Sequence, residues 1–496
     1  MTITISQDTK FEAVIGLEVH VELSTATKLF CGCANDFGSE PNTNVCPVCM
    51  ALPGALPVLN ERVVEFALRI GEALEFDVPN QSVFHRKNYF YPDMPKNFQT
   101  SQFDQPICMD GKLEIETSQG TKVIRIERAH MEEDTGKSTH VGESGRLHGA
   151  DYSLVDYNRA GVPLMEIVSR PDISSSEEAR AYVGELRAVL KAIDVSDVKM
   201  EEGSMRVDAN VSVRPVGQQE LGTRAEIKNM NSLRSLGRAV DYEISRQVAR
   251  VKSGEKIVQE TRHWNENEGK TSSMRSKEEA NDYRYFPEPD LVPVVPTDVM
   301  REMVHAGMPE LPAQKRNRII EDWKISESDA RTLVSNPELY DFVEGAVSLS
   351  SVKIAKDATN FATIEVAGEL NEKGLDISVA PITSENLAEV CELVSNGDLS
   401  RNQAKTLLGY LVDRGGVVSS VVGELGLKQV SDEGALEQIV DSILSQFPED
   451  VAQWPDADEA KRKKLQGFFM GKCMAQSKGQ GNPQIFNSMI ESKLAK

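Results

Sequence analysis

One run near the N-terminus, residues 16–23, constrains the fold of this chain more than any other. Its sequence, GLEVHVEL, alternates apolar and polar residues with a period of two, which is the repeat of a β-strand. Glu18, His20 and Glu22 therefore face one side, and the apolar residues face the other. Such a strand packs its apolar face into a core. Its polar face either meets water or offers two carboxylates and an imidazole to a cation.

Two later stretches repeat this pattern. Residues 205–214 and 224–228 alternate polar and apolar side chains with the same period, so each predicts a strand with one polar face. Short turns and longer polar loops separate the strands, which favours a largely antiparallel sheet with helices on one side. The polar positions of the two stretches include Arg206, Asp208, Asn210, Glu226 and Lys228.

Helical patterns divide the chain into domains. Residues 176–193, which begin with a serine, and residues 233–252 have the spacing of amphipathic helices. The proline-rich segment 285–293 ends the mixed region, and nearly all later patterns are helical. The predicted fold class is α+β, and the length of 496 residues suits two to four domains. The predicted domains are 1–295 with a mainly antiparallel sheet, an all-helical middle domain at 296–398 and a helical tail at 399–496.

Four of the seven cysteines form a C-x-C and a C-x-x-C pair across a short loop. This spacing suits tetrahedral thiolate coordination of zinc. Four thiolates would close the coordination shell, so we expect a structural zinc that holds the loop 31–49 together, with no catalytic role. The predicted ligands are Cys31, Cys33, Cys46 and Cys49.

Further carboxylates follow strand-like runs. Glu133 lies in the sequence HMEED at 130–134, which follows the strand-like run 123–127, and Glu166 lies within the apolar run 163–168. A lone glutamate in an apolar strand is costly unless it is paired or bound to a metal, so Glu166 predicts either a structural salt bridge or a metal ligand. Mg²⁺ prefers oxygen ligands, and a two-metal site for ATP needs several carboxylates of this kind. Basic residues nearby, including Lys87, Arg206 and Lys228, would neutralise phosphate charge.

Two resemblances to a phosphate-binding P-loop fail. The motif needs a glycine five residues before its Gly-Lys-Ser/Thr end. The chain has Met131 at that place before Gly136, and Trp264 at that place before Gly269. The polar face of the sheet is therefore the better candidate for ATP.

The charge and hydropathy of the chain exclude some functions. The net charge of −22, from 55 basic and 77 acidic residues, argues against broad non-specific binding of nucleic acid, although a local basic site is compatible with it. The densest basic run is Lys461–Lys464, which fits a solvated helix surface equally well. No run of about 18 apolar residues and no signal peptide is present, so we expect a cytoplasmic protein that does not span a membrane.

Five long motifs are distinctive: residues 16–23, 86–93 (RKNYFYPD), 130–134 (HMEED), 282–290 (DYRYFPEPD) and 478–483 (KGQGNP). The motif at 86–93 interleaves basic and aromatic residues and also fits a packed aromatic turn. Together the five motifs are similar to those of the B subunit of the tRNA-dependent amidotransferase GatCAB, and the resemblance extends over essentially the whole chain.

This resemblance implies an ATP-dependent carbon–nitrogen ligase that uses glutamine as its amide donor. The family phosphorylates the side-chain carboxylate of Glu on tRNA(Gln) or of Asp on tRNA(Asn). An amidase A subunit then supplies ammonia through a channel, and a small C subunit wraps the other two to complete a heterotrimer. The N-terminal domain would be similar to glutamine synthetase, and the tail would be similar to YqeY proteins. A non-catalytic zinc-stapled scaffold that binds tRNA and a stand-alone ligase are the alternatives.

The resemblance also implies roles for single residues. The matching positions for Mg²⁺ are Glu18, His20, Glu133, Glu166 and Glu226. Weaker candidates for contacts with ATP or the aminoacyl end are Lys87, Arg206, Asp208, Asn210 and Lys228. Candidates for contacts with the tRNA backbone are Lys461, Arg462, Lys463, Lys464, Lys472 and Lys478.

Overall fold

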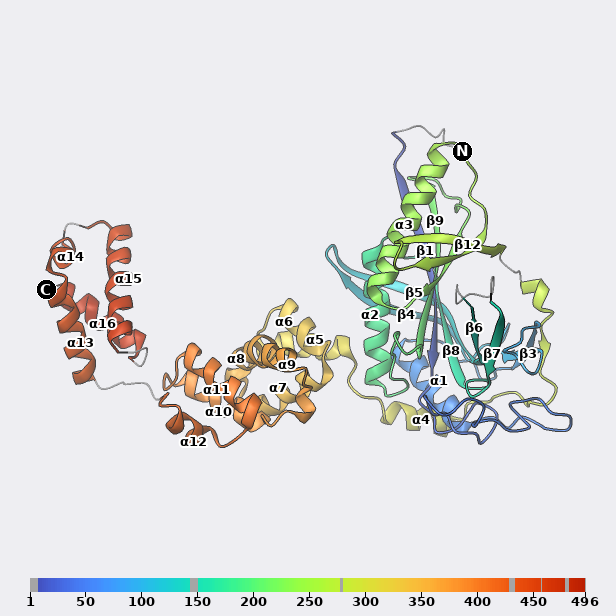
Figure 1. The fold of residues 1–496 in the computed structure, drawn as a ribbon, viewed down its shortest axis with the longest axis horizontal. Helices are drawn as coiled ribbons and strands as arrows, with labels where there is room; N and C mark the ends of the chain where they lie inside the picture. The colour runs from blue at the N-terminus through green and yellow to red at the C-terminus, as the bar shows by residue number, and fades with distance from the viewer. Residues whose placement is uncertain are drawn as a thin grey trace. The chain divides into compact units, whose positions relative to one another are not determined.

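The computed structural model describes residues 8–142, 150–276, 280–427, 433–455, 457–477 and 481–495. The chain divides into two compact units, Met1–Pro312 and Ala313–Lys496 (Figure 1). The first unit contains all the strands of the described residues, and the second is helical there. The fold class is therefore α+β, as the sequence predicts.

The first unit is built on an eight-stranded sheet with the order β12-β11-β10-β9-β1-β8-β5-β4. All neighbouring strands are antiparallel except β10 and β11, which are parallel. The strands are β1 (Phe11–Glu22), β4 (Cys108–Thr117), β5 (Gly120–Glu133), β8 (Pro163–Ser169), β9 (Met205–Pro215), β10 (Ala225–Met230), β11 (Glu260–Asn265) and β12 (Lys270–Ser276).

The central strand β1 shows why this sheet forms. Its apolar residues Leu17, Val19 and Val21 are fully buried in the core of the unit. The polar residues between them lie on the other face, so the period-two pattern is realised as predicted. Helices cover the apolar face, and Figure 1 shows α2 and α3 along one side of the sheet. The helices of this unit are α1 (Glu61–Ala73), α2 (Ser176–Ala192), α3 (Leu233–Lys252) and α4 (Asp298–Ala306).

Both helices predicted from periodicity in this unit begin at a serine cap. The side chain of Ser175 accepts a hydrogen bond from the backbone N–H of Glu178 at the start of α2, and Ser232 does the same for Ser235 at the start of α3. A side-chain oxygen at this position satisfies a backbone donor that the helix leaves unpaired, so the sequence sets where each helix begins.

Two small sheets flank the large one. The first has the order β13-β2-β3 and joins residues 286–287 to the start of the motif at 86–93. The second is the hairpin β6-β7. Their strands are β2 (His85–Asn88), β3 (Phe98–Ser101), β6 (Lys137–Val141), β7 (Tyr152–Asp156) and β13 (Phe286–Pro287).

The second unit contains two hydrophobic cores. One extends from Ile319 to Val421, and the other from Leu436 to Leu494. A π-helix at Phe361–Val366 joins α8 to α9. The α-helices are α5 (Pro312–Trp323), α6 (Glu327–Val334), α7 (Pro337–Leu349), α8 (Ala355–Asn360), α9 (Ala367–Lys373), α10 (Ser384–Ser395), α11 (Arg401–Arg414), α12 (Val418–Glu424), α13 (Glu433–Gln446), α14 (Pro448–Ala452), α15 (Glu459–Gln476) and α16 (Pro483–Leu494).

The domain boundaries of the structure differ from those predicted. The first unit continues to Pro312 because α4 packs on α1, with His305 Nδ1 2.6 Å from Glu72 Oε1. The predicted boundary at 398 falls between α10 and α11, which share one hydrophobic core. Proline-rich and N-cap signals mark where elements end, and a core can continue across them. No helix of the described residues is both long and apolar enough to cross a membrane.

Candidate functional site

The strand register places polar residues in a row across the large sheet. His20 on β1 lies opposite Glu166 on β8 and opposite Arg206 on β9. Glu166 in turn lies opposite His130 on β5. Four strands therefore contribute one residue each to this row, on the face that the helices do not cover.

A second set of polar residues lies nearer the start of β1. Glu18 pairs with Asp208 on β9, and Asn210 on the same strand pairs with Glu226 on β10. The amide of Asn210 donates a hydrogen bond of 2.9 Å to Glu18 Oε1, which fixes the direction of that carboxylate. Residues far apart in the sequence are thus brought together by the pairing of β1, β9 and β10.

His20, Glu132 and Glu166 form the first possible metal site, called here the histidine group. Each offers a ligand atom, and these atoms lie within 4.8 Å of one another. His20 Nε2 is 3.4 Å from Glu166 Oε2 and 3.7 Å from Glu132 Oε1. Burial alone would lower the pKa of His20, but the two carboxylates outweigh it and raise that pKa to about 9.

His130 flanks the histidine group from β5. Its Nε2 lies 3.4 Å from Glu166 Oε2 and 3.8 Å from Glu132 Oε2, and its ring is buried. Its Nδ1 has no hydrogen-bond partner among the described residues. Burial opposes ionisation of Glu166, yet His130 and His20 hold the pKa of that carboxyl well below its usual range. The histidine group with its neighbour His130 therefore places two ionised carboxylates next to two imidazoles.

Glu18, Asp208 and Glu226 form the second possible site, called here the carboxylate group. Their oxygens also lie within 4.8 Å of one another. The ammonium of Lys228 forms ion pairs with Asp208 and, at 3.3 Å, with Glu226. Burial would lower the pKa of Lys228, but these carboxylates raise it. A lysine ammonium thus already acts as the cation of this group.

The donor sets of both groups fit divalent cations. Mg²⁺ binds through carboxylate oxygens and completes its shell with water and phosphate oxygens. The carboxylate group supplies three such side chains, and the histidine group supplies two with one imidazole. The resident Lys228 and the protonated histidine show that both places attract positive charge.

A cleft of about 660 Å³ lies over the histidine group and the adjoining end of β9. His20, Glu132 and Asp208 line it, together with the cations Lys87 and Arg206. The cleft therefore places cations next to both groups of possible metal ligands.

Lys87 and Arg206 are held in the cleft by different partners. The Lys87 ammonium is 4.9 Å from the centre of the Tyr283 ring. Burial would lower the pKa of Lys87, but Glu132, Tyr285 and Glu166 raise it. Arg206 Nη1 lies 2.9 Å from Asp134 Oδ2 and also contacts Glu22 at 3.3 Å.

The placement of Glu133 differs from the prediction. It lies outside both groups, and its neighbour Glu132 occupies the position in the histidine group. Glu133 instead forms an ion pair with Lys96 and accepts a hydrogen bond of 2.8 Å from the backbone N–H of Thr100. Consecutive residues of a strand face opposite sides, so only one of the two glutamates can reach the cleft.

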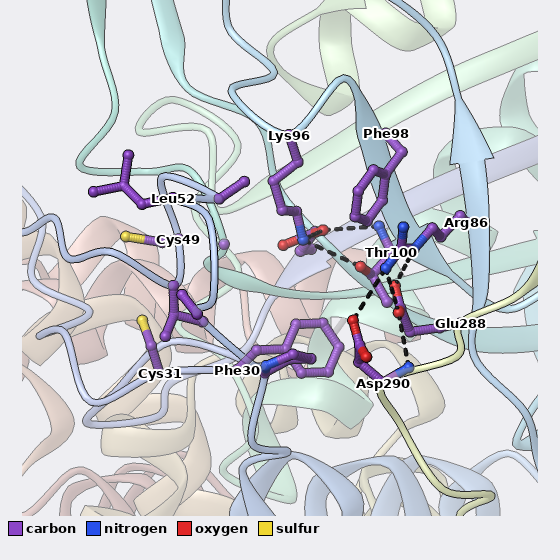
Figure 2. A pocket seen from close by; sticks show the side chains of 16 residues that line it. Phe30, Cys31, Cys49, Leu52, Arg86, Lys96, Phe98, Thr100, Glu288 and Asp290 are labelled. Atoms are coloured by element: carbon purple, nitrogen blue, oxygen red, sulfur yellow. Dashed lines mark hydrogen bonds and ion pairs between the residues drawn. The ribbon is translucent and has the colours of Figure 1, made fainter.

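Glu133 and Lys96 line a separate cavity of about 190 Å³ (Figure 2). Arg86 forms a bidentate ion pair with Glu288 in its wall, with two hydrogen bonds of 2.7 Å. This pair fastens the motif at 86–93 to the motif at 282–290. Cys31 and Cys49 form the opposite part of the wall.

The four predicted zinc ligands Cys31, Cys33, Cys46 and Cys49 lie together, with their sulfur atoms within 4.8 Å of one another. None of them forms a disulfide. A hydrogen bond from Cys31 lowers the pKa of Cys49 to about 5, which favours a thiolate at that position. Four convergent thiol groups fit a tetrahedral metal with a closed shell.

The predicted tRNA contacts lie on α15 where the structure describes them. Lys461, Arg462, Lys463 and Lys464 are exposed in its first turns. Lys472, also exposed, lies 5.3 Å from the centre of the Phe447 ring and 5.5 Å from that of Phe468. Lys478 falls outside the described residues.

The structure thus brings Glu18, His20, Glu166 and Glu226 into the two groups, and it adds residues that sequence reasoning missed. Asp208, a predicted contact for ATP or the aminoacyl end, lines the cleft and also belongs to the carboxylate group. The residues predicted from the sequence do not include Glu132 and His130, which the structure places at this site. The two are separated by one residue in the HMEED motif, so the alternation of a strand places them on the same face.

Two family models match the chain. The GatB/GatE catalytic domain matches residues 13–302, and the GatB domain matches residues 341–494. Both groups of possible metal ligands and the cleft lie within the first match.

The chain is also similar over its full length to curated proteins named as the B subunit of aspartyl/glutamyl-tRNA(Asn/Gln) amidotransferase. It is 49% identical to the protein from Caldanaerobacter subterraneus subsp. tengcongensis over 98% of this chain and 100% of that protein. It is 46% identical to the protein of a Picosynechococcus species over 100% of both. It is 49% identical to the protein of Gloeobacter violaceus over 100% of this chain and 89% of that protein.

Proposed function

The chain belongs to the family of B subunits of aspartyl/glutamyl-tRNA(Asn/Gln) amidotransferases, and on that premise we propose that it activates misacylated tRNA for amidation. Its substrates are Glu-tRNA(Gln), Asp-tRNA(Asn) or both, together with ATP. It works in a heterotrimer with an amidase A subunit, which supplies ammonia from glutamine, and a small C subunit. This role in protein synthesis fits a cytoplasmic location.

The observation that carries the proposal is the pair of ligand groups on one face of the sheet. A carboxylate is a poor electrophile, so an amide cannot form from it and ammonia directly. An oxygen of the substrate carboxylate attacks the γ-phosphorus of ATP, and ADP leaves. Ammonia then attacks the acyl carbon, inorganic phosphate leaves, and the nitrogen loses a proton. Both steps move negative charge past the histidine and carboxylate groups, where positioned cations are needed.

The side chains of the cleft have separable roles in this scheme. Glu18, Asp208 and Glu226 would hold one Mg²⁺, and His20, Glu132 and Glu166 a second. Bound there, the ions supply charge neutralisation for the phosphate oxygens. Lys87 and Arg206 extend this positive charge along the cleft, and Asn210 keeps Glu18 aimed at its group. Lys228 pairs with Asp208, and with a cation bound at the carboxylate group its ammonium would be available to a phosphate oxygen.

The remaining roles are structural or concern the tRNA. A structural Zn²⁺ at the four cysteines would hold the loop 31–49 closed. The exposed lysines and arginine of α15 would contact the tRNA backbone, and few such contacts suffice if other parts of the complex share the binding.

Alanine at Glu18 or His20 tests the proposal in the assembled heterotrimer. We expect loss of transamidation of Glu-tRNA(Gln) and Asp-tRNA(Asn), with tRNA binding retained. Glu12→Ala is the matched control, because Glu12 lies on the same face of β1 but pairs with Arg214, outside both groups. Unchanged transamidation in the Glu18 and His20 variants would contradict the proposed metal chemistry and favour a non-catalytic scaffold that binds tRNA.

The source of ammonia is tested separately. The purified chain, given ammonium, ATP, Mg²⁺ and Glu-tRNA(Gln), should support at most slow amidation, and glutamine should not replace ammonium. Efficient glutamine-dependent activity without the other subunits would show that this chain is a stand-alone ligase.

A further inference from the structure

Lys28 is a fully buried lysine next to the four cysteines. Its ammonium donates hydrogen bonds to two backbone carbonyls, those of Asn44 at 2.8 Å and Tyr157 at 3.3 Å. It also lies 3.8 Å from the sulfur of Cys49. Within the described residues no carboxylate oxygen lies within ion-pair distance of this ammonium, and the thiol of Cys49 is the titratable group in contact with it.

A buried ammonium needs a compensating charge, which two carbonyl dipoles do not supply. Four neutral thiols would not supply it, whereas a single thiolate at Cys49, 3.8 Å from the ammonium, would supply one negative charge. A divalent cation bound by four thiolates carries a net charge of two minus, because each thiolate contributes one negative charge. A metal tetrathiolate at Cys31, Cys33, Cys46 and Cys49 would therefore give Lys28 a stronger counter-charge than one thiolate does.

Lys28 also joins two segments that lie far apart in the sequence. The carbonyl of Asn44 belongs to the loop 31–49, and that of Tyr157 belongs to the turn 157–162. Further hydrogen bonds join the same segments, including one of 2.8 Å from the Asn44 N–H to Asn158 Oδ1. The cysteine loop is thus attached to this turn along several residues.

The turn 157–162 continues to the cleft over the histidine group. The backbone N–H of Gly161 donates a hydrogen bond of 2.9 Å to the carbonyl of Asp134. Arg159 Nε lies 3.4 Å from Asp134 Oδ2, the same oxygen that contacts Arg206 in the cleft. A displacement of the turn would therefore disturb the partners of Arg206.

We propose that Lys28 is a positioning residue that compensates the charge of a metal tetrathiolate at the four cysteines and fastens the loop 31–49 to the turn 157–162. The inference rests on the zinc part of the proposed function and not on the Mg²⁺ chemistry. It assigns the metal a second effect besides closing the loop, because the same charge holds the turn that carries Arg159.

Lys28→Met in the full-length chain tests this inference, because methionine keeps much of the side-chain length and removes the charge. We expect zinc affinity to fall about ten- to a hundredfold, the usual effect of losing a group that supports a metal ligand. Zinc transfer to a chromogenic chelator measures the affinity, and the sulfur-to-metal absorption of the Co²⁺-loaded protein shows whether four thiolates still bind. Leu29→Met is the control, since Leu29 is equally buried and uncharged.

A stability measurement separates charge compensation from simple packing. With zinc bound, Lys28→Met should unfold at a lower urea concentration than the unmodified chain. With zinc removed, the difference in urea midpoint should shrink, because at most one thiolate, that of Cys49, then faces the ammonium of the unmodified chain. A packing role alone would lower the urea midpoint equally in both states and would overturn the inference.

A labelling experiment needs no variant and covers the case in which Lys28→Met does not fold. Acetylation by an amine-reactive reagent should spare Lys28 in the zinc-loaded chain and modify it after zinc removal, as read by mass spectrometry. Equal labelling in the two states would overturn the inference. A chain that binds neither zinc nor Co²⁺ would also overturn it, while leaving the amidation tests of Glu18 and His20 unaffected.

Discussion

At the scale of single residues, the histidine group holds its charges in balance without a metal. Glu132 is buried and Glu166 is largely so, and His20 and His130 each lie within 3.8 Å of both carboxylates. Protonated imidazole thus takes the place that a divalent cation would fill. Proton binding and metal binding should therefore compete at this group.

The competition predicts a pH dependence of Mg²⁺ binding. The pKa of His20 is raised to about 9, so below pH 9 the imidazole is protonated and must lose its proton before it can ligate. The apparent affinity should rise about tenfold per pH unit toward pH 9 and then level off. Calorimetry in two buffers of different ionisation enthalpy would detect the released proton. An affinity that is flat between pH 7 and pH 9 would contradict the role of His20.

His130 provides a second prediction at this scale. Its Nε2 faces both carboxylates, while its Nδ1 has no partner among the residues that the structure describes, so its effect on a metal would act through Glu132 and Glu166. His130→Leu should weaken binding of Mn²⁺, measured by electron paramagnetic resonance, about ten- to a hundredfold. His130→Gln keeps a donor and should retain most of the affinity.

A core truncation on the same part of the sheet serves as the control for His130. Ile167 is fully buried on the opposite face of β8, next to Glu166 in the chain. Ile167→Val should cost about 1 kcal/mol of stability and leave Mn²⁺ affinity unchanged. Equal losses of affinity in the Ile167 and His130→Leu variants would show that His130 supports the fold alone.

At the scale of elements, the register of β5 decides which glutamate reaches the cleft. Glu132 and Glu133 are neighbours, so they face opposite sides of the strand. Glu132 joins His20 and Glu166, whereas Glu133 joins Lys96 in the separate cavity. The two carboxylates are chemically alike in the sequence and serve different places in the structure.

Glutamine substitutions separate the two carboxylates. Glu132→Gln should weaken Mg²⁺ binding strongly, because it removes a charged ligand, and transamidation should fall with it. Glu133→Gln should leave Mg²⁺ affinity within about twofold, since its carboxylate is paired elsewhere; isothermal titration of each full-length variant would measure this. The opposite order of effects would mean that β5 has slipped by one residue relative to β8.

The sequence predicted the strands well and their partners less well. The alternation in residues 16–23 and 205–214 predicted β1 and β9, and the amphipathic spacing in residues 176–193 and 233–252 predicted α2 and α3. Alternation tells which residues share a face but not which strands are neighbours. The site depends on the order β10-β9-β1-β8-β5, which long-range pairing determines. Glu133 was predicted as the ligand in place of Glu132 because the sequence does not reveal how β5 pairs with β8.

At the scale of the whole molecule, a strongly acidic chain carries its basic run on a helix of a separate small core. That core contains Leu436, Phe469 and Phe486. Helix α15 contributes Phe469 to the core and carries the exposed Lys461–Lys464 run. Net repulsion between the chain and tRNA falls off within about 8 Å at physiological salt, so a local basic surface can still act. This placement is compatible with the tRNA contacts proposed for the Lys461–Lys464 run.

Charge reversal of this run should weaken tRNA binding without affecting metal binding. Changing Lys461, Arg462, Lys463 and Lys464 to Glu should reduce the salt dependence of tRNA affinity by up to about one unit of slope per lost phosphate contact. Filter binding of tRNA to the heterotrimer at several salt concentrations would measure this. Lys353→Glu, an exposed lysine before α8, is the control. An unchanged slope would mean that the run is only a solvated surface.

The alternation of β1 has one more consequence. Glu18 belongs to one ligand group and His20 to the other, and two residues along a strand advance by about 6.6 Å. If both groups hold an ion, the rise of the β1 backbone fixes the distance between the two ions. Aspartate and glutamate differ by one methylene, and this fixed distance cannot adjust to that difference. We therefore expect an enzyme of this design to accept the two acids by placing the end of the tRNA differently, with selectivity between them set by the tRNA.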